Sequence, residues 1–114
     1  GDGSQSRDFT YVDDIAEGTI KSLERVGYEI MNLGGGQNPI SLLTVIEMIE
    51  KSLGKKASFE NRQFPKTDMK ETWANISKAK KLLDWSPQVD FQEGLDRTIA
   101  WYQANKGWLS KVKL

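Results

Sequence analysis

Short strand-like segments alternate with amphipathic helices along this chain, and this alternation restricts the fold more than any other feature. Residues 8–12 are rich in aromatic and β-branched side chains, which is typical of a strand. Residues 28–33 and, more weakly, 57–62 are further strand candidates. The order strand, helix, strand, helix, strand predicts a small mixed α/β domain, with too few strands for a full doubly wound sheet.

Four helices are expected between and after these strands, because apolar residues recur there at helical spacing. Their predicted starts and stops follow the usual capping preferences, with short polar side chains before each helix and glycine after it. The predicted N-caps are Asp13 or Asp14, Ser41, Ser77 and Asp90, and the predicted stops are Gly27, Gly54 and Gly107.

The length of 114 residues indicates one compact domain, which we expect to cover residues 1–107 with a loosely held tail over 108–114. Residues 1–6 form a turn-rich loop with no element before it, so the chain is expected to be a piece of a longer protein. Trp73, Trp85 and Trp101 are predicted to fill the core, whereas Trp108 is expected to be exposed.

Composition excludes several classes of function. The chain has no cysteine and no histidine, which removes thiolate catalysis, disulfides and the commonest general base and metal ligand. Its formal net charge is zero, so it lacks the basic excess of a nucleic-acid binder. No stretch approaches the roughly 20 apolar residues of a membrane span, and no signal peptide opens the chain, so we expect a cytoplasmic location.

Two motifs suggest catalysis or phosphate binding only weakly. Residues 34–36 are three glycines, but no Lys-Ser or Lys-Thr pair follows them, so a flexible turn is favoured over a phosphate loop. Tyr102 and Lys106 have the spacing of the short-chain dehydrogenase tyrosine and lysine. They fall in the last predicted helix turn, where a lysine suits the helix dipole, so we interpret the match as coincidence.

Three side chains could bind an anionic or polar ligand. Arg7 precedes a predicted strand and could donate two N–H bonds to a phosphate, or form a salt bridge to a carboxylate such as Asp8. Arg62 has the same two interpretations. Asn32, before the glycine turn, could offer its amide to a ligand or cap the turn.

Four stretches, in order along the chain, resemble the extended short-chain dehydrogenase/reductase family, more narrowly its nucleotide-sugar epimerases and dehydratases. Residues 1–14 resemble the glycine-rich loop, Arg-Asp-aromatic sequence and acidic pair that open the carboxyl-terminal substrate domain of that family. Residues 30–35 resemble its Tyr-Asn-Ile-Gly-Gly segment, and residues 72–87 its Ala-Asp-x-Ser-Lys-Ala stretch ending in Gly-Trp-x-Pro. Residues 93–102 fit its Glu-Gly-Leu-x-x-Thr-x-x-Trp-Tyr pattern.

The resemblance implies specific roles. Arg7 matches the family arginine that contacts the nucleotide diphosphate, and Asn32 matches an asparagine near the nucleotide. The loop from Arg62 to Asp68 matches the region of a second diphosphate-binding arginine, and either Arg62 or Lys66 could supply that contact. The implied ligand is a UDP- or dTDP-linked sugar bound through its diphosphate.

The chain lacks the family's Gly-x-x-Gly-x-x-Gly loop and its catalytic residues in their proper context. The resemblance therefore implies that an amino-terminal dinucleotide domain binds NAD and carries the chemistry, and that this chain binds no cofactor and is inactive alone. The 114 residues by themselves leave enzymatic activity open. The alternative function is a free-standing α/β interaction module without an enzymatic role.

Overall fold

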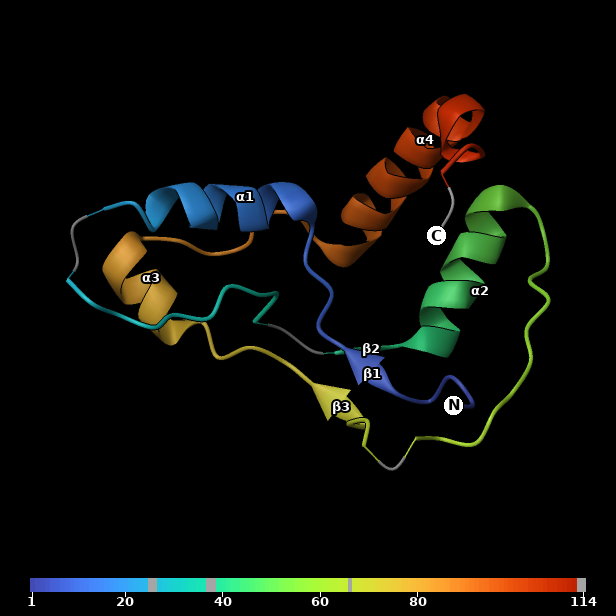
Figure 1. The fold of residues 1–114 in the computed structure, drawn as a ribbon, viewed down its shortest axis with the longest axis horizontal. Coiled ribbons are helices and arrows are strands. Elements are labelled where there is room, and N and C mark those ends of the chain that lie inside the picture. The colour runs from blue at the N-terminus through green and yellow to red at the C-terminus, as the bar shows by residue number, and fades with distance from the viewer. Residues whose placement is uncertain (25–26, 37–38, 66, 113–114) are drawn as a thin grey trace.

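The structure is a computed structural model that describes residues 1–24, 27–36, 39–65 and 67–112. Its elements, shown in Figure 1, confirm the predicted α/β class with four helices and three short strands. Their bounds are β1 Ser6–Arg7, α1 Val12–Lys21, β2 Ile40–Ser41, α2 Leu42–Leu53, β3 Glu71–Thr72, α3 Ser77–Leu83 and α4 Phe91–Leu109.

The three strands form one small mixed sheet with β1 in the middle. β2 pairs with β1 antiparallel and β3 pairs with β1 parallel, so the order is β2-β1-β3. In this register Arg7 lies between Ile40 and Thr72. Each strand is only two residues long, so the sheet joins three segments that are distant in the sequence but contributes little length of its own.

The positions predicted for the strands were wrong. β1 precedes the expected segment 8–12, and the described residues contain no strand at 28–33 or 57–62. Residues 28–33 expose Tyr28 and Ile30, at 92% and 71% of their surface. A strand requires a neighbour with ladder hydrogen bonds, and within the described part of the chain no strand pairs with this segment.

The capping predictions hold for two helices. The Ser41 side chain accepts the N–H of Thr44 at the start of α2, and Gly54 ends α2 with φ 62°, in the left-handed region. The Asp90 carboxylate accepts the N–H of Glu93 at the start of α4.

The remaining caps and stops differ from the predictions. Tyr11, not an aspartate, is the N-cap of α1, and α1 ends at Lys21, well before Gly27. Ile76 is the N-cap of α3, where Ser77 is already helical and its N–H is accepted by Asn75 Oδ1 at 3.0 Å. α4 continues through Gly107 to Leu109, because a glycine in a helix lowers stability without forcing a stop.

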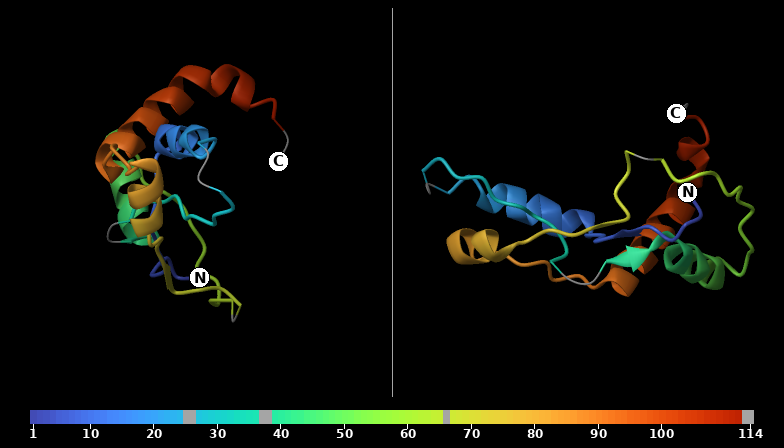
Figure 2. Two further views of the ribbon diagram at one scale, coloured as in Figure 1. Left: turned by 90° about the vertical axis from the view of Figure 1, so that its left-hand side faces the viewer. Right: turned by 90° about the horizontal axis from the view of Figure 1, so that it is seen from below.

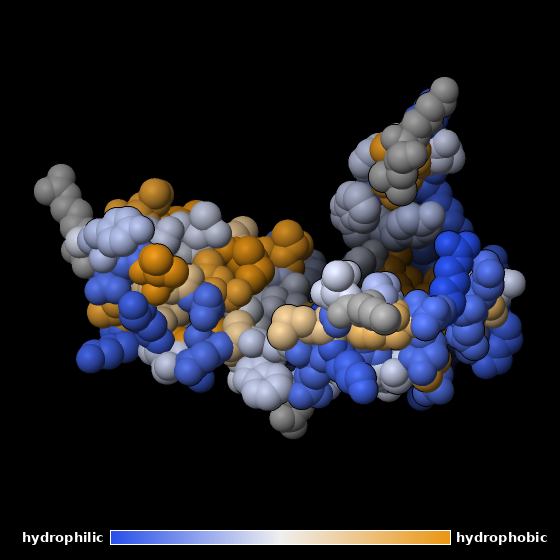
Figure 3. All heavy atoms as spheres, turned by 60° about the horizontal axis from the view of Figure 1, so that its bottom comes forward, coloured by the Kyte–Doolittle hydropathy of each residue, from blue (hydrophilic) through white to orange (hydrophobic). Residues whose placement is uncertain are grey.

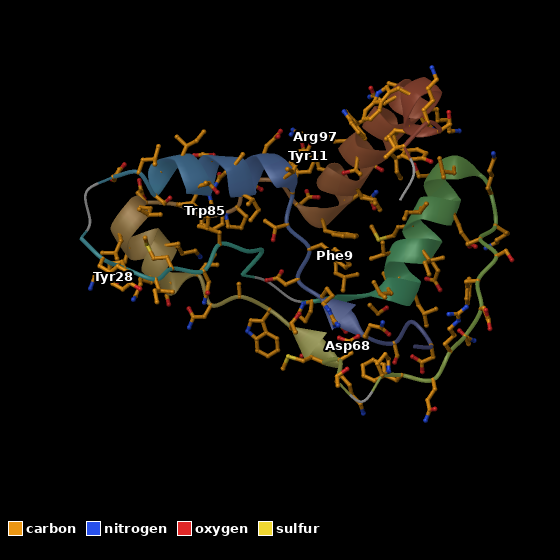
Figure 4. All side chains as sticks on the ribbon, in the orientation of Figure 1. Phe9, Tyr11, Tyr28, Asp68, Trp85 and Arg97 are labelled. Atoms are coloured by element: carbon orange, nitrogen blue, oxygen red, sulfur yellow. The ribbon has the colours of Figure 1, made fainter. Side chains whose placement is uncertain are left out.

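The core lies between α1 and α3 (Figure 4). Trp85 is fully buried there, as predicted, and its indole N–H is accepted by the carbonyl oxygen of Asp14 at 3.0 Å. Trp108 is half exposed, as expected, but Trp73 and Trp101 are also exposed, so the prediction that they fill the core was wrong. The other buried apolar residues are Ile76, Ala79 and Leu83.

The helices lie in two pairs on either side of the sheet. α1 packs beside α3 and α2 packs beside α4, an arrangement visible in Figures 1 and 2. Figure 3 shows hydrophobic side chains gathered at the α1–α3 end, whereas the end with α2 is mainly hydrophilic. Among the described residues no helix has the length and apolar character needed to cross a membrane.

Candidate functional site

Arg7 is fixed by the central strand of the sheet. The N–H groups that flank it are both used in pairing with the third strand, Ser6 to the carbonyl of Lys70 at 2.8 Å and Asp8 to that of Thr72 at 3.2 Å. The Arg7 backbone is therefore held on both sides, although its side chain keeps part of its surface exposed.

The Arg7 guanidinium forms the predicted type of salt bridge, but with Asp68 and not with Asp8. Its Nη2 donates to Asp68 Oδ1 at 2.7 Å, and its Nη1 donates to the carbonyl of Ser6 at 2.8 Å. Asp68 Oδ1 also accepts the N–H of Met69 at 2.8 Å, which holds the carboxylate in place. Figure 4 shows Asp68 beside the sheet.

These contacts orient Arg7 without using all its donors. A guanidinium has five N–H groups, and the bonds to Ser6 and Asp68 are the ones it makes among the described residues. The side chain of Arg7 is 28% exposed and that of Asp68 is 38% exposed. Arg7 is thus a partly exposed, pre-oriented cation, which is suited to bind a phosphate in two-pronged geometry.

Asn32 contacts the segment that follows the third strand. Its side-chain Nδ2 donates to the carbonyl of Asn75 at 3.4 Å, which is a long hydrogen bond. Asn32 is exposed, two residues before the glycine turn. The interpretation of Asn32 as a cap of its own turn finds no support in this bond, since the partner is 43 residues away.

Arg62 lies farther from the sheet. Its Nη2 pairs with Glu60 at 3.2 Å with both side chains about three-quarters exposed, at 77% and 75%, and its N–H donates to the carbonyl of Gly1 at 3.2 Å. A pair this exposed contributes little to stability, so the Arg62 side chain can leave Glu60 for another anion. The alternative phosphate partner, Lys66, lies outside the described residues.

Asp8 has a role that the sequence did not reveal. Its Oδ2 accepts the N–H of Gly36 at 2.7 Å and the N–H of Ala74 at 3.5 Å. In a phosphate loop the backbone N–H groups donate to the ligand, but here the N–H of Gly36 donates to a carboxylate of the chain itself. This supports the interpretation of residues 34–36 as a turn.

A broad apolar pocket of about 410 Å³ lies beside the candidate site, between the β1–α1 connection and helices α2 and α4. Tyr11, one of the lining residues, carries the guanidinium of Arg97 over its ring, with the Arg97 Cζ 5.4 Å from the ring centroid. Figure 4 labels both side chains. The hydrogen bond from Arg97 to Glu93, at 2.6 Å, raises the pKa of the guanidinium further. The pocket is lined by Phe9, Thr10, Tyr11, Val12, Val45, Val89, Asp90, Phe91, Gly94, Leu95 and Thr98.

Neither a metal cluster nor the predicted Tyr-Lys pair lines this pocket within the described part of the chain. No group of three or more carboxylates that could hold a metal ion occurs among them. Tyr102 and Lys106 lie on α4 with exposed side chains, and Tyr102 keeps 54% of its surface. The polar side chains in the pocket lining are Thr10, Asp90 and Thr98, and the Asp90 carboxylate is already bound to the N–H of Glu93.

Comparison with known proteins identifies the family. Residues 1–98 match the family model described as GDP-mannose 4,6 dehydratase. A UDP-glucuronate 4-epimerase of Thermodesulfobacterium geofontis is 56% identical over the whole chain, which covers 35% of that relative.

Solved structures agree with this match. The UDP-glucuronic acid 4-epimerase of Bacillus cereus, in complex with UDP-glucuronic acid and NAD, is 40% identical over 91% of the chain with a TM-score of 0.81. The epimerase Mth375 of Methanothermobacter thermautotrophicus is 35% identical over 97% of the chain, with a TM-score of 0.87. In each case the chain covers 34% of the solved structure.

The chain therefore spans about a third of the length of the relatives it matches. The family match extends over most of the chain and includes the segments that hold Arg7, Asn32 and Arg62. The chain belongs to the GDP-mannose 4,6 dehydratase family of NAD-dependent sugar epimerases and dehydratases, within the extended short-chain dehydrogenases/reductases.

Proposed function

We propose that residues 1–107 form the substrate-binding part of an NAD-dependent enzyme that epimerises a UDP-linked sugar, and that Arg7 binds the diphosphate of that substrate. The observation that carries the proposal is the pre-oriented guanidinium of Arg7, held by Asp68 and Ser6 with donors to spare. A phosphate offers paired oxygen acceptors that match such a planar fork.

The relatives support 4-epimerisation of a UDP-hexuronic acid over dehydration or decarboxylation. The 56% identical relative is a UDP-glucuronate 4-epimerase, and a 40% identical structure holds UDP-glucuronic acid. Fold alone does not determine a substrate, so the proposal depends on the similarity of this region, which supplies the groups that touch the nucleotide in the proposed site.

We further propose that NAD and the catalytic residues belong to an amino-terminal dinucleotide domain, and that this chain alone is inactive. The chain covers about a third of its relatives and its described residues form no dinucleotide loop. NAD would supply transient oxidation of the sugar hydroxyl in the complete enzyme, while this chain holds the nucleotide end of the substrate.

Exposed apolar residues provide a surface for that domain. Val12, Ile20 and Leu23 lie along one face of α1 and its continuation, with 67%, 67% and 82% of their surface exposed. Tyr28 and Ile30, farther along the chain, are also exposed, at 92% and 71% of their surface. Figure 3 shows hydrophobic side chains gathered at the α1–α3 end of the molecule. Exposed apolar side chains gathered on one part of a molecule are typical of an interface.

The role of Arg7 is tested by titrating UDP into the chain and into the variant Arg7→Ala, with binding followed by calorimetry. A charge-assisted hydrogen bond contributes about 1.5–3 kcal/mol, so the dissociation constant should rise at least about tenfold. The thermal unfolding midpoint should stay within a few degrees, since the Arg7 side chain is partly exposed.

Arg62→Ala is the matched control, because it removes the second candidate arginine from an exposed pair. We expect a smaller loss of affinity than for Arg7→Ala, since the Arg62 side chain pairs with an exposed carboxylate, that of Glu60, and is less firmly oriented. Equal UDP affinity in the wild-type chain and in Arg7→Ala would remove Arg7 from the site and overturn the proposal.

A further inference from the structure

We propose that Asp8 is the positioning residue of the candidate nucleotide site, because its carboxylate holds the segment of Asn32 in register with the strand of Arg7. This inference rests on the proposed function. Asp8 itself touches no ligand in this account; it acts through the two residues that do.

The side chains of Arg7 and Asp8 make their contacts on opposite sides of the extended segment that contains β1. Successive side chains of an extended chain point to opposite faces, so Arg7 meets Asp68 on one side while Asp8 meets the glycine turn on the other. The N–H of Asp8 donates to the carbonyl of Thr72 at 3.2 Å, which ties the residue to the third strand as well.

The carboxylate of Asp8 joins two separate segments. Its Oδ2 accepts from Gly36 at 2.7 Å and, more weakly, from Ala74 at 3.5 Å. A carboxylate is an acceptor at every lone pair, so it can receive both N–H groups at once without a repulsive donor. The short bond to Gly36 is the stronger of the two and fixes the turn.

The glycine turn is packed directly against this carboxylate. A Cβ placed on Gly35 would lie 2.1 Å from Asp8 Oδ1, and one placed on Gly34 would lie 2.6 Å from the Cβ of Ala74. Gly34 and Gly35 are both buried. The glycines are therefore explained by close approach to Asp8 and Ala74, so the turn cannot move independently of the carboxylate.

These contacts form a closed circuit of hydrogen bonds and short chain segments. Asp8 binds Gly36, the chain runs back from Gly36 to Asn32, and Asn32 donates to the carbonyl of Asn75. Asn75 follows Ala74, which returns to Asp8. The bond between Asn32 and Asn75 is long at 3.4 Å, so it cannot by itself hold Asn32 at a fixed distance from Arg7. Leu33 packs against the core on one side of this segment, and Asp8 adds the constraint at its glycine end.

The test compares UDP with inorganic pyrophosphate as ligands of the chain and of Asp8→Asn. Asparagine has the shape of aspartate and can accept both N–H groups through its amide oxygen, since both donors meet the same oxygen of Asp8, but it carries no charge, so both bonds lose their charge assistance. Since pyrophosphate needs Arg7 while UDP also needs Asn32, Asp8→Asn should weaken UDP binding about fivefold, as expected when a hydrogen bond to a charged acceptor becomes one to a neutral acceptor. Pyrophosphate affinity should change less than about twofold.

The amide resonance of Gly36 reports its hydrogen bond to Asp8 in the absence of any ligand. In Asp8→Asn this resonance should shift, and the amide proton should exchange faster with solvent. Asp13→Asn, the same change at an exposed position of α1, is the control and should change the affinity for neither ligand. All titrations are made below the unfolding midpoint of each variant. Asp8→Ala, which removes the oxygen that accepts both N–H groups, should weaken UDP binding further than Asp8→Asn does.

Equal weakening of UDP and pyrophosphate in Asp8→Asn would mean a general loss of structure and would overturn the positioning role. Unchanged affinity for both ligands would also overturn it, while leaving the proposed function intact. If the wild-type chain bound neither UDP nor pyrophosphate, the proposed function would fail and the role of Asp8 with it.

Discussion

Gly18 lies under the one fully buried tryptophan, and its missing side chain lets α1 approach the core. A Cβ at this position would stand 2.9 Å from the Trp85 ring and 2.9 Å from both methyl groups of Leu33. Trp85 is 1% exposed and cannot give way. Gly18→Ala should therefore destabilise the chain by about 1–2 kcal/mol, because overpacking outweighs the gain of about 1 kcal/mol in helix propensity.

Gly107→Ala, in α4, should change the free energy of unfolding in the opposite direction. A Cβ there meets no atom within 4 Å, so only the gain in helix propensity remains, and we expect stabilisation of about 0.5–1 kcal/mol. Urea unfolding of both variants measures the two signs. Stabilisation by Gly18→Ala would contradict the close packing of α1 on Trp85.

The least predictable residues were two aspartates. Asp14 was expected to cap a helix, but it is 3% exposed and accepts the N–H groups of Gln88 and Val89, both at 3.0 Å. Asp8 was considered as a salt-bridge partner of Arg7, yet it binds Gly36 and Ala74. Both carboxylates satisfy backbone groups far along the chain, which no local pattern encodes.

The end of α2 is tied to the loop that follows it by Glu50. Its carboxylate accepts from Lys56 Nζ at 2.6 Å and from the N–H of Ala57 at 2.7 Å. The hydrogen bond from Lys56, and then the one from Ala57, hold the pKa of Glu50 below its ordinary value of 4.5. The stability that these bonds add is present above that ordinary value and is lost as pH falls through the lowered pKa.

Glu50→Gln should therefore be less stable than the wild type at pH 7, and the difference should shrink as the pH falls below about 4.5. Urea midpoints measured from pH 7 to pH 3 test this. Glu47→Gln, at an exposed position one turn earlier on α2, is the control and should show a smaller change. A constant difference between wild type and Glu50→Gln at all pH values would contradict the assignment.

At the scale of elements, helices were predictable and strands were not. α2 and α4 carry their own signals, since Ser41 and Asp90 cap them and their apolar spacing is local. The strands are two residues long and exist through pairing between segments more than 30 residues apart. Residues 28–33 have the composition of a strand but no strand partner among the described residues. Local propensity alone therefore predicts a strand that tertiary contacts do not form.

At the scale of the whole molecule, Arg7 was singled out from the sequence and the structure explains its orientation. Asp68, its partner, was not foreseen, because 61 residues separate the two. The fully buried core is small, and apolar residues of α1 and of residues 28–30 remain exposed. A chain with this surface and this family match is accounted for by the proposed role as one part of a two-part enzyme.

A chimera tests this role most directly. In it, the present chain replaces the 35% of the Thermodesulfobacterium geofontis UDP-glucuronate 4-epimerase that it matches. The account predicts that the chimera epimerises UDP-glucuronate with NAD, and that Arg7→Ala within it raises KM at least about tenfold. A folded, NAD-binding chimera that neither binds nor epimerises UDP-glucuronate would contradict the account.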